Sequence, residues 1–345
     1  MKKILKFIQK ERLYILLFIF ILTFNLIVLF CDRPKKIESA SKPAVSAGAE
    51  RENVRVLEEA LKKNSRLVVI FSLASLLIFA IIILGIVIDL MLYPIILKKK
   101  LNIRTLSPPR AKWNMWDVCK VAILFIFFGQ MIILTEAFWS RVIHLFKVDN
   151  FRMMINSSIL DTLAVVFIIY FTVVQHREPL TALGISLKDY VKNIFYGVIG
   201  YVAIVPILIL IVAVTAAILN VTKYVPQRQP VVELFLKENG VAFLTFSSLF
   251  AAIVGPIIEE LFFRGFMYGA LKKYIGITWA MVASACLFAA LHAHVVGFFP
   301  IMALGLLLAY LYEKTGTLVS SITVHMIHNL SMVLLVFLLK QSGIV

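Results

Sequence analysis

The sequence contains few cysteines and few charged residues for its length. Its three cysteines, Cys31, Cys119 and Cys286, are odd in number and form no CxxC pair, so they indicate neither a disulfide framework nor a thiolate metal site. Only 16% of the 345 residues are charged, and no HExxH zinc motif occurs. Soluble domains carry about one quarter charged residues. This scarcity of charge excludes an ordinary soluble enzyme.

Apolar residues take the place of the missing charge. They make up 61% of the chain, and the mean hydropathy is +0.95. A helix needs about 20 residues to cross a hydrocarbon core of about 30 Å, and lipid offers no partners for strand edges or bare loops. Apolar runs recur at residues 13–31, 67–97, 118–138, 158–175, 194–221, 241–271, 277–298, 299–312 and 318–339. The sequence therefore predicts an all-α, polytopic transmembrane helical bundle of about 8–9 spans.

The net charge of +16 is spread over loops and forms no single basic arm or patch. Short basic runs, KKILK at the N-terminus, KKKLNIR at 98–104 and LKKY at 271–274, lie beside apolar segments. This distribution is typical of cytoplasmic loops of membrane proteins. We therefore expect contact with the lipid bilayer and no nucleic-acid partner.

The stretch IIEELFFRGF, residues 257–266, places three charges inside an apolar run. Each charge costs about 2.5–3.5 kcal/mol at the centre of a bilayer, so it needs a partner or a function. Glu260 and Arg264 are four residues apart and share a helix face, which allows an ion pair. Glu259 points about 100° away from Glu260 around the helix axis, and no residue nearby in the sequence neutralises its charge. An ion pair of Glu260 with Arg264 fits a role in helix packing and a role in catalysis equally well. The unpaired Glu259 indicates a catalytic role.

Four of the six histidines, His292, His294, His325 and His328, lie in apolar segments near the end of the chain. His292 ends the motif FAALH, residues 288–292. In HMIHN, residues 325–329, the spacing places His325 and Asn329 on one helix face. A single intramembrane histidine usually serves helix packing, but polar groups on three helices indicate a shared site.

Glu259, His292, His325 and Asn329 together suit hydrolysis of an acyl bond by water. A poorly solvated carboxylate can take a proton from water, and histidine can share that task. A side-chain amide and an imidazole can donate hydrogen bonds to the oxyanion that water attack creates. The same two histidines and glutamate also match a zinc site with water in the fourth position, although the ligands would come from three helices.

The motifs EELFFR, FAALH and HMIHN, in this order across residues 259–329, resemble the three motifs of the CPBP family. That family includes the type II CAAX prenyl endopeptidases and bacterial proteins linked to bacteriocin processing and self-immunity. The resemblance covers residues 230–339, and the stretch from 178 is similar to the entry of the family's core. Residues 1–150 have no part in it.

The resemblance implies an intramembrane endopeptidase in a bacterial cell membrane, acting on a membrane-bound peptide or protein or a lipidated substrate. In this interpretation Glu259 activates water with help from His292, His325 and Asn329 stabilise the oxyanion, and Glu260 and Arg264 support the site. No metal and no cofactor are expected, and no role is expected for His294 or for His328, which lies between His325 and Asn329. A scaffold or immunity protein without catalysis, a zinc-dependent protease and a transporter are the alternatives.

The expected organisation has three parts. Residues 1–66 form a signal anchor and a polar linker, residues 67–175 form accessory transmembrane helices, and residues 176–345 form the catalytic core. One geometric conflict arises within the core. His292 lies late and His325 lies early in two spans that run in the same direction, so at least one span boundary or tilt must differ from this assignment.

Overall fold

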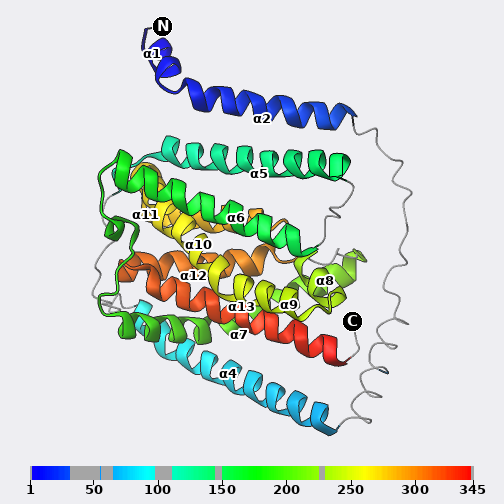
Figure 1. Cartoon of the computed structure of the whole chain (residues 1–345). Coiled ribbons are helices and arrows are strands. Elements are labelled where there is room, and N and C mark those ends of the chain that lie inside the picture. Colours follow the sequence, from blue (N-terminus) through cyan, green and yellow to red (C-terminus); the bar gives the residue numbers. More distant parts are fainter. Residues whose placement is uncertain are drawn as a thin grey trace. The chain divides into compact units, whose positions relative to one another are not determined.

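The computed structural model describes residues 2–31, 65–97, 111–143, 150–224 and 230–342, together with Arg55. Every regular element among these residues is a helix (Figure 1). Eight helical stretches of the described chain are long and apolar enough to cross a membrane. The predicted all-α, polytopic class with 8–9 spans is confirmed. The expected polar linker before residue 67 lies almost entirely outside the described residues.

The chain forms two compact units, each assembled from two separate segments of the sequence. The first unit takes its elements from residues 1–42 and 112–177, and the second from 43–111 and 178–345. The elements of the first unit are α1 (Lys2–Lys10), α2 (Arg12–Cys31), α5 (Met115–Ile143), α6 (Asn150–Ile169) and the π-helix η1 (Tyr170–Gln175). The expected three-part division of the chain stays a prediction.

Buried charges in the first unit are paired with one another. Lys120 Nζ of α5 lies 2.9 Å from Glu11 Oε2 at the junction of α1 and α2. Asp117, at the start of α5, accepts a hydrogen bond from Gln175 Nε2 and contacts His176 Nε2 at 2.9 Å. Charges in an apolar unit need such partners, so this cluster is explained by helix packing.

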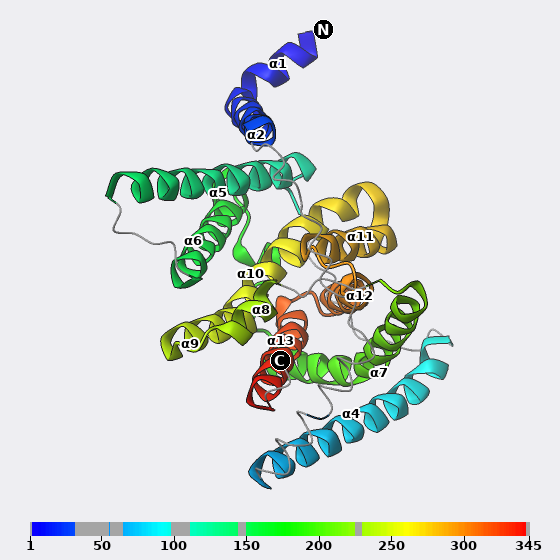
Figure 2. The ribbon, with the colours of Figure 1, turned by 90° about the vertical axis from the view of Figure 1, so that its right-hand side faces the viewer.

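The second unit contains the motif residues. Its elements are α4 (Ser65–Leu97), the 3-10 helix η2 (Leu180–Leu183), α7 (Tyr190–Thr222), α8 (Pro230–Lys237), α9 (Val241–Leu249), η3 (Phe250–Val254), α10 (Gly255–Glu260), η4 (Leu261–Tyr268), α11 (Gly269–Leu291), α12 (Phe298–Thr315) and α13 (Leu318–Ser342). In this unit α12 contacts α7, α11, α13 and η4 (Figure 2). Its apolar face forms a core of Leu304, Leu308 and Leu311 with Val324 of α13. The helix α12 thus lies at the centre of this unit, although none of the motif residues belongs to it.

The helix α4 joins the second unit by packing on α7. Gly85 lies so close to α7 that a Cβ atom on it would stand 2.7 Å from the Pro206 side chain. A glycine at this position allows the two backbones to approach, as is common between transmembrane helices. Helices from both segments of the sequence thus complete this unit.

Gly276 divides the longest apolar stretch, Val241–Leu291, into two passes. Its backbone has φ 74° and ψ 175°, a conformation that is essentially restricted to glycine. The chain reverses direction there. A hydrogen bond from Ser284 Oγ, after the turn, to the Phe263 carbonyl, before it, shows that the two passes lie side by side. The turn lies between the predicted spans 241–271 and 277–298.

The predicted span 277–298 is wrong at its C-terminal end. The helix α11 ends at Leu291, Ala293 has a left-handed φ of 49°, and α12 begins at Phe298. His292 therefore lies directly after the end of α11 and not within a longer span. Hydropathy missed this boundary because the residues after His292 are also largely apolar.

Candidate active site

The two glutamates end a short α-helical segment between two π-helices. The segment α10 is six residues long, η3 precedes it and η4 follows it. π-helical turns are rare and occur often at functional sites, because their wider turns redirect side chains. Glu259 and Glu260 therefore lie where the helix that carries them departs from regular geometry on both sides.

Glu260 and Arg264 form a buried ion pair. Both side chains are 0% exposed, and Arg264 Nη1 donates to Glu260 Oε1 at 2.8 Å. Arg264 Nη2 donates to the Gly305 carbonyl of α12 at 3.2 Å, and the guanidinium lies 4.5 Å from the Phe288 ring centre. The pair expected from the four-residue spacing is present, and a neighbouring helix supplies a second acceptor for the arginine.

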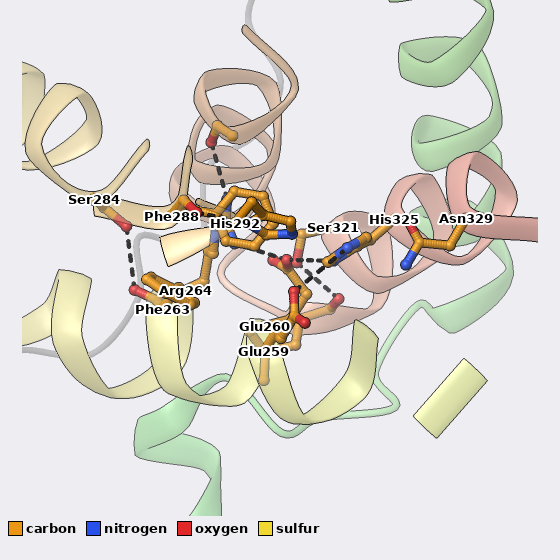
Figure 3. Close-up of polar contacts among 12 residues, drawn as sticks. Glu259, Glu260, Phe263, Arg264, Ser284, Phe288, His292, Ser321, His325 and Asn329 are labelled. Carbon is orange, nitrogen blue, oxygen red and sulfur yellow. Dashed lines mark hydrogen bonds and ion pairs between the residues drawn. The ribbon is translucent and has the colours of Figure 1, made fainter. Parts of the chain in front are cut away.

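His325 of α13 lies between the two carboxylates (Figure 3). Its Nδ1 is 3.0 Å from Glu260 Oε1, and its Nε2 is 3.7 Å from Glu259 Oε2. Glu260 is paired with Arg264 and accepts hydrogen bonds as a carboxylate, so Nδ1 of His325 is the donor. In the neutral ring Nε2 then carries the lone pair, directed toward Glu259.

Glu259 has a different environment from Glu260. Its side chain is 38% exposed, yet its Oε2 atom is buried and has no hydrogen-bond partner among the described residues. The histidine near it comes from position 325, so spacing within its own helix could not reveal this neighbour. One carboxylate of the pair is held by fixed contacts, and the other is accessible.

His292 is the residue that ends α11. Its Nδ1 is 2.7 Å from the Phe288 carbonyl, which can only accept, so Nδ1 donates and Nε2 carries the lone pair. The buried Phe288 ring lies 4.6 Å from the His292 ring and 5.5 Å from the His325 ring, measured between centroids. This aromatic ring therefore contacts both motif histidines. Figure 3 shows the glutamates in the region between His292 and His325.

Asn329 lies one turn after His325 on α13. Its Nδ2 donates to the carbonyl of Ala251 in η3 at 2.9 Å. That bond uses one of two amide hydrogens, which leaves the second for another acceptor. Asn329 is thus held beside the glutamate-bearing helix through Ala251, whereas His325 contacts both Glu259 and Glu260.

His294 and His328, which have no role in the expected mechanism, have other surroundings. His294 Nδ1 accepts from the Gly297 amide at 3.0 Å, which shapes the turn between α11 and α12. The His328 ring lies 6.2 Å from the Tyr201 ring of α7. Neither contact involves the glutamates.

Across the described parts of the chain, no group of three or more His, Cys, Asp or Glu side chains is arranged to hold a metal ion. The zinc alternative requires three such ligands at one site. A surface cavity of about 560 Å³ at the start of α7 is lined by Asp189, Tyr190, Val191, Lys192 and Phe195 and includes no motif residue. The expected convergence of Glu259, His292, His325 and Asn329 on one shared site stays a prediction.

Sequence reasoning missed two contributors to the site. The Gly305 carbonyl is a backbone group, which no side-chain motif can report. Phe288 begins the FAALH motif, but its contact with His325 joins two helices that are distant in the sequence and so depends on the tertiary fold. A Cβ on Gly305 would stand 3.1 Å from Ala285, so a small residue in the middle of α12 is the signal for close helix approach.

Comparison with known proteins places the site within a recognised domain. Residues 241–331 match the family model described as Type II CAAX prenyl endopeptidase Rce1-like. A curated protein of Bacillus subtilis (strain 168), "Putative membrane peptidase YdiL", is 32% identical over 85 residues, which cover 25% of this chain and 35% of that protein. The matched part thus spans about a third of the relative's length. No solved structure matches significantly. Residues 241–331 contain all three motifs, so the site lies within a segment that is similar to the Rce1-like type II CAAX prenyl endopeptidase family.

Proposed function

We propose that this protein is an intramembrane endopeptidase that hydrolyses peptide bonds of membrane-associated or lipidated substrates with water activated by Glu259 and His292. The observation that carries the proposal is the unequal pair of carboxylates. Glu260 is fully buried and bonded through Oε1 to Arg264 and His325, whereas the Glu259 side chain is 38% exposed. Each glutamate has a buried Oε2 without a hydrogen-bond partner among the described residues. A general base must be reached by water to take its proton, and of the two carboxylates only Glu259 is exposed.

The first step is attack of water on the substrate carbonyl carbon. Glu259 accepts one proton of the water as its oxygen bonds to carbon. His292 presents Nε2 as an acceptor, because its Nδ1 hydrogen is bound to the Phe288 carbonyl. A second acceptor can orient the water, and proximity of this kind accounts for a large share of rate enhancement.

Attack of water creates a tetrahedral carbon with a negative oxygen. The second amide hydrogen of Asn329 can donate to that oxygen, since the first is held by Ala251. His325 can also donate from Nε2 when the ring carries two protons, because Nδ1 remains bonded to Glu260. Fixed donors of this type need no reorganisation during the reaction.

Collapse of the tetrahedral intermediate breaks the carbon–nitrogen bond. The proton that Glu259 took from water passes to the leaving nitrogen, which departs as an amine while the carbonyl re-forms. Glu259 is then a carboxylate again, so protons and charges balance over one cycle. Glu260 and Arg264 keep their charges throughout and hold His325 in place.

The test compares cell membranes that contain wild type, Glu259→Gln or Glu233→Gln, with peptide ends identified by N-terminal labelling and mass spectrometry. Glutamine is nearly isosteric with glutamate but cannot accept the proton of water. Loss of a general base lowers turnover by about 10²–10⁴-fold. We expect new peptide ends with wild type and with the exposed Glu233→Gln control, and none with Glu259→Gln.

The same ends at the same rate in Glu259→Gln membranes would refute the general-base role. An absence of new ends with wild type would instead support a scaffold or immunity protein. Melting curves of the three purified proteins, measured in detergent, separate loss of chemistry from loss of folding.

A further inference from the structure

A second buried polar cluster lies in the same unit, near the end where Gly276 and Gly316 turn the chain. Glu313 of α12 is 6% exposed. Its carboxylate accepts from Tyr268 Oη at 2.9 Å and from Lys272 Nζ at 2.7 and 2.8 Å. Both donors belong to the helix that continues from the two glutamates. None of the three cluster residues belongs to a motif, and the mechanism above does not use them.

The donors continue a regular stripe along their helix. Residues four apart share one helix face, and this face carries Glu260, Arg264, Tyr268 and Lys272. The stripe is fixed to α12 at two points, through Arg264 on the Gly305 carbonyl and through Tyr268 and Lys272 on Glu313. Two attachment points eight residues apart on α12 restrict sliding and rotation of this helix on its neighbour.

Contacts connect the cluster to the catalytic groups. Glu313 fixes α12, and α12 supplies the Gly305 carbonyl that binds Arg264. Arg264 holds Glu260, and Glu260 accepts from Nδ1 of His325. A shift of α12 would move the acceptor of Arg264 and then the carboxylate that orients the imidazole. Buried helices transmit such displacements because their interiors are closely packed.

We propose that Glu313, with Lys272 and Tyr268, positions the active site by fixing α12 against the helix that carries Glu259 and Glu260. Through Arg264 and Glu260 it sets the orientation of His325. Its kinetic consequence rests on the proposed protease function. The orientation of His325 can be measured without any substrate.

The kinetic arm uses purified full-length protein in detergent, with the peptide substrate identified by the membrane comparison described above. Glu313→Gln removes the charge that Lys272 faces, and a misplacement of about 1 Å can cost 10²-fold in rate. We expect kcat to fall about ten- to a hundredfold, with KM nearly unchanged. The control, Glu233→Gln, alters the exposed pair with Lys237 and should leave kcat unchanged.

A charge exchange distinguishes positioning from a general loss of packing. The double variant Lys272→Glu with Glu313→Lys restores an ion pair between the same two positions, and the Tyr268 hydroxyl can bond either partner. We expect kcat of the double variant to recover most of the loss caused by Glu313→Gln.

The spectroscopic arm needs no activity. Imidazole ¹⁵N signals of histidine-labelled protein report which ring nitrogen carries a proton, and a His325→Ala variant assigns the His325 signals. In wild type, Nδ1 of His325 should show the signature of a donor to a carboxylate. We expect this signature to change in Glu313→Gln and to return in the charge-exchanged variant, with the His294 signals constant.

Several results would overturn the positioning role. Unchanged kcat and unchanged His325 signals in Glu313→Gln, with only a lower melting temperature, would reduce the cluster to a stabilising contact. If wild type cleaves nothing, the protease function fails, and the His325 signals alone decide the positioning role. If Glu313→Gln does not fold, Tyr268→Phe removes one hydrogen bond and no charge, and unchanged His325 signals in it would refute the proposal.

Discussion

Replacement of Glu260 by glutamine tests how the buried ion pair holds the site. The substitution keeps the size of the side chain and removes the negative charge between Arg264 and His325. Arg264 remains 0% exposed and keeps its hydrogen bond to the Gly305 carbonyl, but its charge loses the partner 2.8 Å away. The guanidinium can neither reach solvent nor give up its proton, so the cost falls on the folded state.

The expected magnitude follows from this burial. Breaking a buried ion pair by removing one partner costs about 3–5 kcal/mol, because the remaining charge is uncompensated. At about 1.4 kcal/mol for each factor of ten, the ratio of folded to unfolded protein falls roughly a hundredfold to a few thousandfold. Glu260→Gln with Arg264→Met removes both charges, and such replacements are often neutral. The double variant should therefore be more stable than Glu260→Gln alone.

The assay is reversible unfolding in mixed micelles with increasing sodium dodecyl sulfate, followed by far-ultraviolet circular dichroism. The free energy of unfolding is compared among wild type, both Glu260 variants and the exposed Glu233→Gln control. A loss below about 1 kcal/mol for Glu260→Gln, the range of surface ion pairs, would refute the reasoning. So would a double variant no more stable than the single one.

Three further outcomes are expected. Asn329→Ala should lower kcat about 10²–10³-fold through loss of an oxyanion donor, and the free energy of unfolding by only about 0.5–1.5 kcal/mol through loss of its bond to Ala251; an unchanged kcat would remove Asn329 from the oxyanion site. Gly305→Ala should cost about 1–3 kcal/mol by overpacking against Ala285, read from the same unfolding curves; wild-type stability would contradict the close approach of α11 and α12. A chelator should leave cleavage largely unchanged, whereas a zinc enzyme would lose the ion that lowers the pKa of its water to about 7; activity lost on chelation and restored by zinc would assign His292 and His325 as ligands.

Sequence patterns predicted those structural features that depend only on residues close together in the chain. The apolar runs predicted the helices, and the four-residue spacing predicted the pair of Glu260 with Arg264, because both follow from helix geometry alone. The position of His325 between two carboxylates could not be predicted, because it depends on how α13 packs against a helix 65 residues earlier. The end of α11 was missed for another reason. The left-handed φ of Ala293 ends that helix, and hydropathy carries no signal of it.

The contact of α4 with α7 has a consequence for the order in which the chain is made. The helix α4 is complete at Leu97, but its partner begins only at Tyr190, after the helices of the first unit have been synthesised. At about 5–20 residues per second, α4 waits roughly 5–20 seconds for the surface that Gly85 packs on. During that time α4 lacks its contact with α7. Its mean hydropathy of 3.0, close to the 3.1 of α7, suits a helix that must be stable in the bilayer before its partner exists.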